Sequence, residues 1–65
     1  MNKITTFDKK IATNITKLRK KFNISVEQIA EYLYIDSSFV RSVEGFDKKY
    51  NLRHLFLIKD LFEKY

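Results

Sequence analysis

The stretch Ser25–Gly45, SVEQIAEYLYIDSSFVRSVEG, decides the fold of this chain. Its apolar residues recur at helical spacing and define one inward face, which consists of Ile29, Ala30, Leu33, Ile35, Val40 and Val43. The outward positions of its second half are polar, namely Ser37, Ser38, Arg41 and Ser42. This pattern predicts two short helices that share an apolar seam and meet at a tight corner, which is typical of a helix-turn-helix.

Capping signals predict where the first of these helices begins. Ser25 and Gln28 have the spacing of a capping box, and Ile24 and Ile29 have that of a hydrophobic staple. The first helix should therefore follow Ser25 and run to about Leu33.

The second helix of the stretch is expected over residues 37–44. Asp36 precedes it as a suitable N-cap. Gly45 follows it and suits the left-handed conformation in which many helices end. The residues Tyr34 and Ile35 form the corner between the two helices.

Longer amphipathic patterns lie on both sides of this stretch. Before it, apolar intervals of four and three residues predict a helix over about 7–22. The stripe consists of Phe7, Ile11, Ile15, Leu18 and Phe22. Thr5 and Asp8 have capping-box spacing at its start, with aspartate in place of the usual glutamate or glutamine. After the basic loop 46–50, Asn51 is a suitable N-cap for a last helix that continues to the chain end.

The last helix carries more apolar residues than one buried face requires. Its expected core stripe consists of Leu52, Leu55, Ile58 and Phe62. A second apolar face consists of Leu57, Leu61 and Tyr65, with Phe56 between the two faces. A helix with two apolar faces indicates an interface, so these four residues are the candidate surface of a homodimer. The alternative is a further C-terminal helix, outside this sequence, that covers the face.

Length and composition narrow the fold and function classes. The 65 residues predict a single domain, 1–65, with residues 1–6 as an N-terminal arm, and an all-α bundle of four or five helices. A net charge of +5 favours an anionic partner, nucleic acid first. The apolar runs are too short for a membrane span or a signal peptide, which indicates a soluble cytoplasmic protein.

The residue types that catalysis and metal binding need are sparse. The chain has no cysteine, and its one histidine, His54, has no spaced carboxylate pair on a shared helix face. We expect His54 to be an ordinary surface residue. A single glycine does not allow a glycine-rich phosphate loop. No enzymatic function, cofactor or metal is therefore expected.

The residues at Ile29–Ala30, Leu33, Ile35, Val40, Val43 and Glu44 resemble the phage Cro and lambda-repressor-like helix-turn-helix family, also called XRE-like. The resemblance extends over about residues 11–62, because LRKKFNIS, SVEQIAEYL, IDSSFVRSVEG and NLRHLFLIKDLF follow one another at the family's spacing. It implies a lambda-repressor-like bundle and a sequence-specific DNA-binding regulator, expected to be a repressor that binds a palindromic operator as a dimer.

Such a regulator would belong to the cytoplasm of a bacterial or phage-infected cell. The alternative that stays open is a protein-interaction module on the same fold, such as an antitoxin, an anti-activator or an assembly adaptor, with little or no DNA binding. In that case the partner is a protein.

Three positions depart from the family pattern. Tyr34 stands at the corner, where the family usually has a glycine in the left-handed conformation. Val26 stands where a glutamine often anchors the DNA backbone, and Gly45 comes one residue early, with Phe46 in the usual glycine place.

The resemblance also implies roles for charged and polar residues. A partly buried ion pair between Arg19 and Glu44 should lock the second helix of the stretch against the helix over 7–22. The candidates for reading DNA bases are Ser37, Ser38, Arg41 and Ser42, with Arg41 first because arginine can contact guanine O6 and N7 together. The candidates for phosphate contacts are Ser25, Lys20, Lys21, Lys48 and Lys49. Phe39 is expected to pack partly against the protein.

Overall fold

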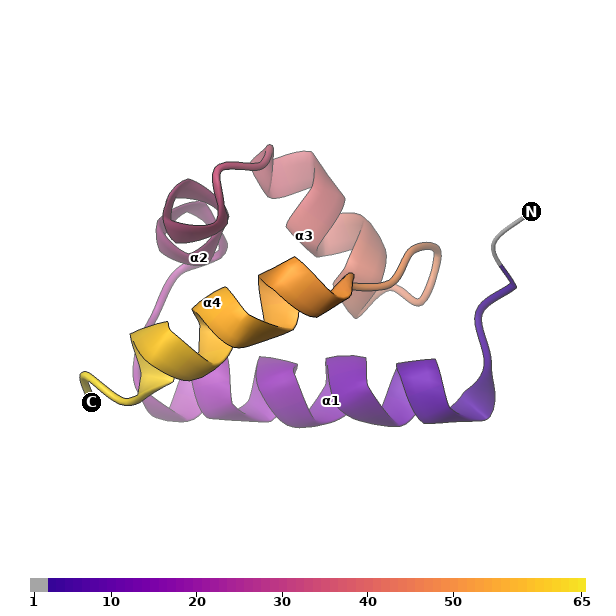
Figure 1. Cartoon of the computed structure of the whole chain (residues 1–65), viewed down its shortest axis with the longest axis horizontal. Helices are drawn as coiled ribbons and strands as arrows, with labels where there is room; N and C mark the ends of the chain where they lie inside the picture. The colour runs from indigo at the N-terminus through magenta and orange to yellow at the C-terminus, as the bar shows by residue number, and fades with distance from the viewer. Residues whose placement is uncertain (1–2) are drawn as a thin grey trace.

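The structure is a computed structural model that describes residues 3–65, and these residues form four helices and no strands (Figure 1). The helices are α1 (Thr6–Lys21), α2 (Val26–Leu33), α3 (Ser37–Glu44) and α4 (Leu52–Phe62). The predicted all-α class is thus confirmed. The last helix is shorter than expected, since it ends at Phe62 rather than at the chain end.

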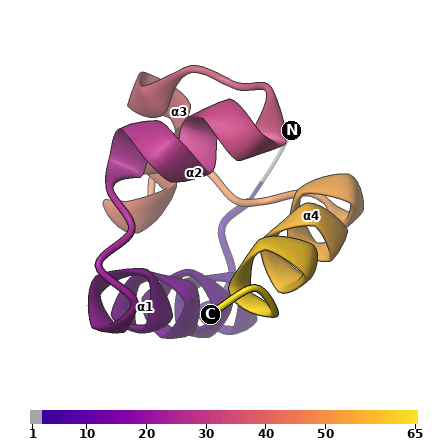
Figure 2. The same ribbon diagram turned by 90° about the vertical axis from the view of Figure 1, so that its left-hand side faces the viewer.

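The four helices form a small bundle. The long helix α1 lies on one side of the core, the shorter α2 and α3 lie across the opposite side, and α4 runs along one flank between them (Figures 1 and 2). Helix α2 packs against both α3 and α4, while α3 also contacts α1. The two helices of the predicted helix-turn-helix are therefore supported from below by the rest of the chain.

The predicted helix-turn-helix stretch supplies the centre of the core. Its side chains Ile29, Leu33, Val40 and Val43 are the largest that are fully buried. Ala30 is buried as well, as expected from its place on the inward face. Around them lie the remaining buried apolar residues, which are Ala12, Ile15, Ile24, Tyr50, Ile58 and Leu61.

Three of the four helices begin with a reciprocal capping box. Those of α1, with Thr5 and Asp8, and of α2, with Ser25 and Gln28, confirm the prediction. In the latter, the Gln28 amide donates to Ser25 Oγ at 3.0 Å, and the Ser25 amide donates to Gln28 Oε1 at 2.8 Å. Asp36 is the N-cap residue of α3, but its side chain accepts no capping hydrogen bond.

Each corner of the chain contains a non-glycine residue in the left-handed region. Tyr34 has φ 59° and ψ 44°, the conformation in which the resemblance implies a glycine, and its side chain is 85% exposed. The prediction for Gly45 was wrong, because Gly45 has φ −89° and the left-handed residue is Phe46, with φ 69°. Asn23, at φ 58°, is the third such residue.

Helix α1 is rotated relative to the predicted apolar stripe. Phe7 and Leu18 are exposed, whereas Ala12 is buried beside Ile15. The rotation follows from a polar requirement, since Arg19 turns inward to reach Glu44 of α3. Leu18, the neighbour of Arg19, is therefore carried toward solvent.

Candidate nucleic-acid interface

Helix α3 presents a polar face that the core leaves open. On the opposite side of the helix, Val40 and Val43 are buried in the core. The four predicted base-reading residues fall within one arc of the helical wheel, because positions three or four residues apart share a face, as do Ser37 and Arg41, Ser38 and Arg41, and Ser38 and Ser42. Of these, Ser38 and Arg41 are exposed, and Ser37 and Ser42 are partly buried. The structure therefore brings the predicted set together on one surface.

A buried ion pair fixes α3 against α1. Arg19 Nε lies 2.7 Å from Glu44 Oε2, and Arg19 Nη2 lies 3.1 Å from Glu44 Oε1. The third nitrogen, Nη1, donates to the carbonyl oxygen of Ile24 at 2.8 Å. The two side chains are only 11% and 17% exposed. This bidentate pair confirms the predicted bridge, and it uses Arg19 for structure.

Arg41 belongs to a second, exposed cluster that the sequence did not indicate. Its Nη1 donates to Ser37 Oγ at 3.1 Å, and its Nη2 forms an ion pair with Glu27 in the first turn of α2. The side chains of Arg41 and Glu27 are 57% and 64% exposed. The pKa of Glu27 lies below its ordinary value because its own backbone amide and then Arg41 stabilise the carboxylate. Glu27 and Arg41 are 14 residues apart, and no sequence pattern at that separation predicted their contact.

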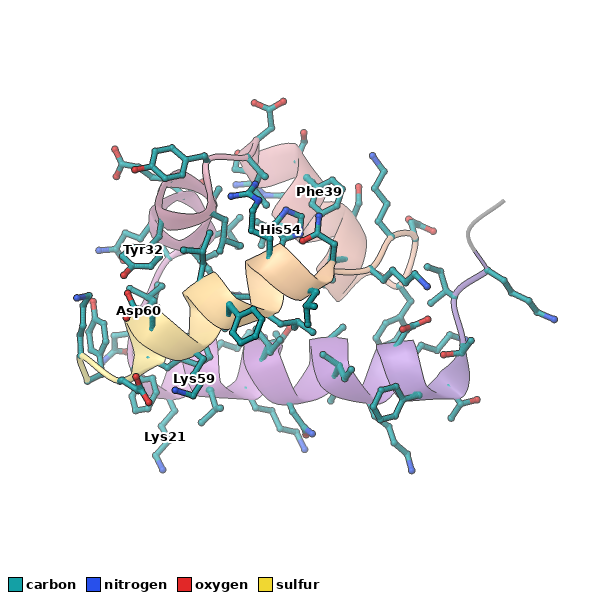
Figure 3. The ribbon with its side chains drawn as sticks, viewed as in Figure 1. Lys21, Tyr32, Phe39, His54, Lys59 and Asp60 are labelled. Atoms are coloured by element: carbon teal, nitrogen blue, oxygen red, sulfur yellow. The ribbon has the colours of Figure 1, made fainter. Side chains whose placement is uncertain are left out.

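Phe39 packs against the start of α4 and leaves the polar face of α3. Its ring lies 5.5 Å from the imidazole of His54 in an edge-on arrangement (Figure 3). The ring also lies near Lys48, whose Nζ is 5.1 Å from the ring centroid. The partial packing predicted for Phe39 is thus present, with His54 as the aromatic partner.

His54 is a buried residue, so its assignment to the surface was wrong. Its amide donates to Asn51 Oδ1 at 2.8 Å, and its Nδ1 accepts from the Asn51 amide at 3.1 Å, which completes the capping box of α4. Tyr50 packs against it, with ring centroids 5.9 Å apart. Burial lowers the pKa of His54, and the nearby Arg53 cation lowers it further. The imidazole is therefore neutral at pH 7, with Nδ1 as an acceptor.

The predicted phosphate contacts are dispersed. Lys48 and Lys49 are exposed in the loop after α3, and Lys49 Nζ lies 3.7 Å from Asp8 Oδ2. The hydroxyl of Ser25 caps α2. Lys21, in the last turn of α1, lies on the side of that helix away from α2 and α3, so the structure separates it from the polar face (Figure 3). Lys20 is exposed in the same turn.

The predicted self-association face is only partly available. Leu61 is 8% exposed and belongs to the core, so its assignment to an interface was wrong. Leu57 is partly buried, and Tyr65 stacks on Phe22 with ring centroids 5.6 Å apart. Leu57 and Leu61 are drawn inward because α4 packs against α2, whereas Tyr65 stays 61% exposed.

Two apolar residues of α4 remain exposed on one face. Phe56 is 64% exposed, and Leu52, four residues before it, is exposed as well. Leu52 was predicted in the core, and His54 occupies that place instead.

A groove of about 580 Å³ lies between α2 and α4. It is lined by Gln28, Glu31, Tyr32, Tyr34 and Leu57. The Tyr32 hydroxyl donates to the Asp60 carboxylate and so connects the two helices beside the groove (Figure 3).

Within residues 3–65, no helix combines the length and the apolar character that a membrane crossing needs. The same part of the chain holds no group of three or more His, Cys, Asp or Glu side chains placed to bind a metal ion.

Comparisons with protein-family models, with curated proteins and with solved structures found no match for this chain.

Proposed function

We propose that this protein binds double-stranded DNA in a sequence-specific manner, with α3 in the major groove, and acts as a transcriptional repressor of the Cro-like, XRE-like kind in a bacterial or phage-infected cell. One observation carries the proposal. Helix α3 is fixed on its inner side by Val40, Val43 and the Arg19–Glu44 pair, while its outer side is polar and leaves Ser38 and Arg41 exposed. A recognition helix needs both properties, because its base-reading side chains must be held at a defined height in the groove.

The outer face offers suitable chemistry for base edges. Arg41 can donate two parallel hydrogen bonds to guanine O6 and N7, and the hydroxyls of Ser37, Ser38 and Ser42 can donate or accept. Phosphate contacts are assigned to Lys48 in the loop after α3. The start of α2 is the second phosphate position, because its first amides carry the positive end of the helix dipole.

A homodimer on a palindromic operator completes the proposal. Two recognition helices must lie roughly 34 Å apart to enter successive turns of the major groove on one side of DNA. The exposed pair Leu52 and Phe56 on α4 replaces Leu61 as the proposed contact surface. Phe56→Glu should give a monomer by analytical ultracentrifugation and weaken operator binding, and an unchanged sedimentation coefficient would exclude this surface.

The proposal is tested by selecting bound sequences from random duplex DNA with the purified protein. We expect enrichment of a palindromic site and an affinity that falls steeply as salt rises, because phosphate contacts release counterions. No DNA binding at low salt by the folded protein would refute the regulator function.

The second candidate is a protein-interaction module, which the groove between α2 and α4 favours. Exposed Tyr34 and the carboxylate of Glu31 border this groove, and neither suits a phosphate surface. Absence of DNA binding, together with a retained helical spectrum, would support this candidate over the first.

A further inference from the structure

The exposed cluster formed by Glu27, Ser37 and Arg41 joins the two helices of the helix-turn-helix at its outer surface. We propose that Glu27 restrains Arg41, so that reading a guanine requires Arg41 to exchange the Glu27 carboxylate for guanine O6 and N7. This inference rests on the proposed DNA-binding function and names a residue that regulates the same site.

The hydrogen-bond geometry of Arg41 carries the first step. A bidentate guanine contact uses two neighbouring N–H groups of the guanidinium at once. In the free protein both terminal nitrogens are already engaged, Nη1 by Ser37 Oγ and Nη2 by Glu27. Ser37 lies four residues before Arg41 and Glu27 lies on α2, so these contacts draw the guanidinium back toward the starts of both helices. Arginine has five N–H donors, so the competition is for the position of the guanidinium, which Glu27 and Ser37 hold back from the base edge.

Exposure sets the strength of this restraint. Both partners are more than half exposed, and water and salt screen such a pair. The pair therefore tunes the availability of Arg41 without blocking it. By contrast, the Arg19–Glu44 pair is mostly buried and cannot exchange partners without disturbing the core.

The restraint should act only at the base that Arg41 reads. On a site without guanine at that position, Arg41 keeps its contact with Glu27, and the restraint costs nothing. On the guanine site, the contact must break before the new one forms. Removing the carboxylate should therefore tighten binding to the guanine site and have little effect on a site with A·T at that pair.

The matched control is Glu31, an exposed glutamate one turn later on the same helix. It makes no hydrogen bond or salt bridge with Arg41 in residues 3–65. Glu27→Gln and Glu31→Gln change the net charge equally, so their comparison controls for the overall charge of the protein. The Arg41→Ala background controls for repulsion between Glu27 and a phosphate at the start of α2. Thermal unfolding of each variant confirms that it is folded.

The experiment measures the Kd of each variant on the selected DNA site and on the same site with the guanine replaced. Relative to Glu31→Gln, Glu27→Gln should bind the guanine site about two- to fivefold more tightly, which is the range expected for an exposed ion pair. The gain should vanish on the replaced site and in an Arg41→Ala background. Equal affinities of the two glutamine variants, or weaker binding by Glu27→Gln, would overturn the restraint while leaving the DNA-binding function intact.

A second measurement needs no DNA. NMR titration of the Glu27 carboxyl should show a pKa that rises when Arg41 is replaced by alanine, and an unchanged pKa would overturn the inference. If the wild type and all variants fail to bind DNA at low salt, the proposed function falls, and the role of Glu27 in base reading falls with it.

Discussion

Two arginine–glutamate pairs connect α3 to its neighbours, and they differ chiefly in exposure. Arg19–Glu44 links α3 to α1, is bidentate and is mostly buried. Arg41–Glu27 links α3 to α2 and lies more than half exposed on both sides. The same two chemical groups therefore fix the helix at one place and leave an exchangeable contact at the other. Desolvation explains the difference, since a buried charge that loses its partner has no water to replace it.

Removing Glu44 is expected to have the largest effect. Within residues 3–65, Glu44→Ala leaves the buried Arg19 guanidinium with the Ile24 carbonyl as its one hydrogen-bond partner, so it should lower the free energy of unfolding by about 3–5 kcal/mol. Glu27→Ala should change it by less than about 1 kcal/mol. Urea denaturation followed by circular dichroism compares the two variants. Similar decreases in the free energy of unfolding for the two variants would show that the buried and the exposed pair contribute equally to stability.

Arg41→Ala tests whether the arginine of the exposed pair reads a DNA base. The variant should lose about 1–3 kcal/mol of discrimination at one base pair while its unfolding midpoint stays close to that of the wild type. Lys21→Ala is the charge-matched control, because Lys21 lies on the far side of α1 (Figure 3). Competition binding on single-substitution DNA sites provides the measurement, and equal discrimination by both variants would show that Arg41 does not read a base.

The corner at Tyr34 sets the angle between α2 and α3 and thereby the reach from Glu27 to Arg41. Tyr34→Gly should raise the free energy of unfolding by about 1 kcal/mol, because an L side chain in the left-handed region is strained and this ring is exposed. Asn23 has a left-handed conformation at the corner before α2. Asn23→Gly should raise the free energy of unfolding by less than Tyr34→Gly does, because asparagine tolerates this conformation. Chemical denaturation measures both, and a loss of stability in Tyr34→Gly would mean that the ring makes a stabilising contact.

Tyr50 adds a polar atom near the buried pair. Its hydroxyl is buried without a hydrogen-bond partner among residues 3–65. Burial, and then the negative charge of the Glu44 carboxylate, raise the pKa of Tyr50 to about 12 against the opposing effect of Arg19. Tyr50→Phe should therefore leave the protein as stable as the wild type or up to about 1 kcal/mol more stable. Thermal unfolding at pH 7 checks this, and a clear loss would reveal a partner for the hydroxyl.

The smallest effect is a dependence of stability on pH through His54. Its pKa is lowered on folding, so the unfolded chain binds more protons once the pH drops below about 6.5, the ordinary value for histidine. The part of the free energy of unfolding that depends on neutral His54 is fully present above that pH and is lost as the pH falls through the folded-state pKa. His54→Gln keeps a capping-box residue and removes the titration. Unfolding midpoints between pH 5 and about 7.5 should vary less in this variant than in the wild type.

Much of the fold could be predicted because its signals are local. The capping boxes at Thr5 and Ser25 and the apolar spacing around Val40 fix three helix starts to within a residue. The Arg19–Glu44 pair spans 25 residues, and only the resemblance to a known family indicated it.

The remaining features depend on how the helices pack against one another. The rotation of α1 follows from the inward turn of Arg19, and the burial of His54 and Leu61 follows from the docking of α4. Glu27 and Arg41 meet only because the corner at Tyr34 brings the outer surfaces of two helices together. None of these arrangements could be predicted from the spacing of apolar residues in the sequence.

The imidazole of His54 closes the first turn of α4 with one edge and packs against Phe39 of α3 with its ring. A single side chain therefore belongs to two structural units, a helix cap and an interhelical contact. Fraying at the start of α4 has to release Phe39 at the same time. We expect α3 and the start of α4 to open together as one cooperative segment, although residues 45–53 lie between Glu44 and His54 along the chain.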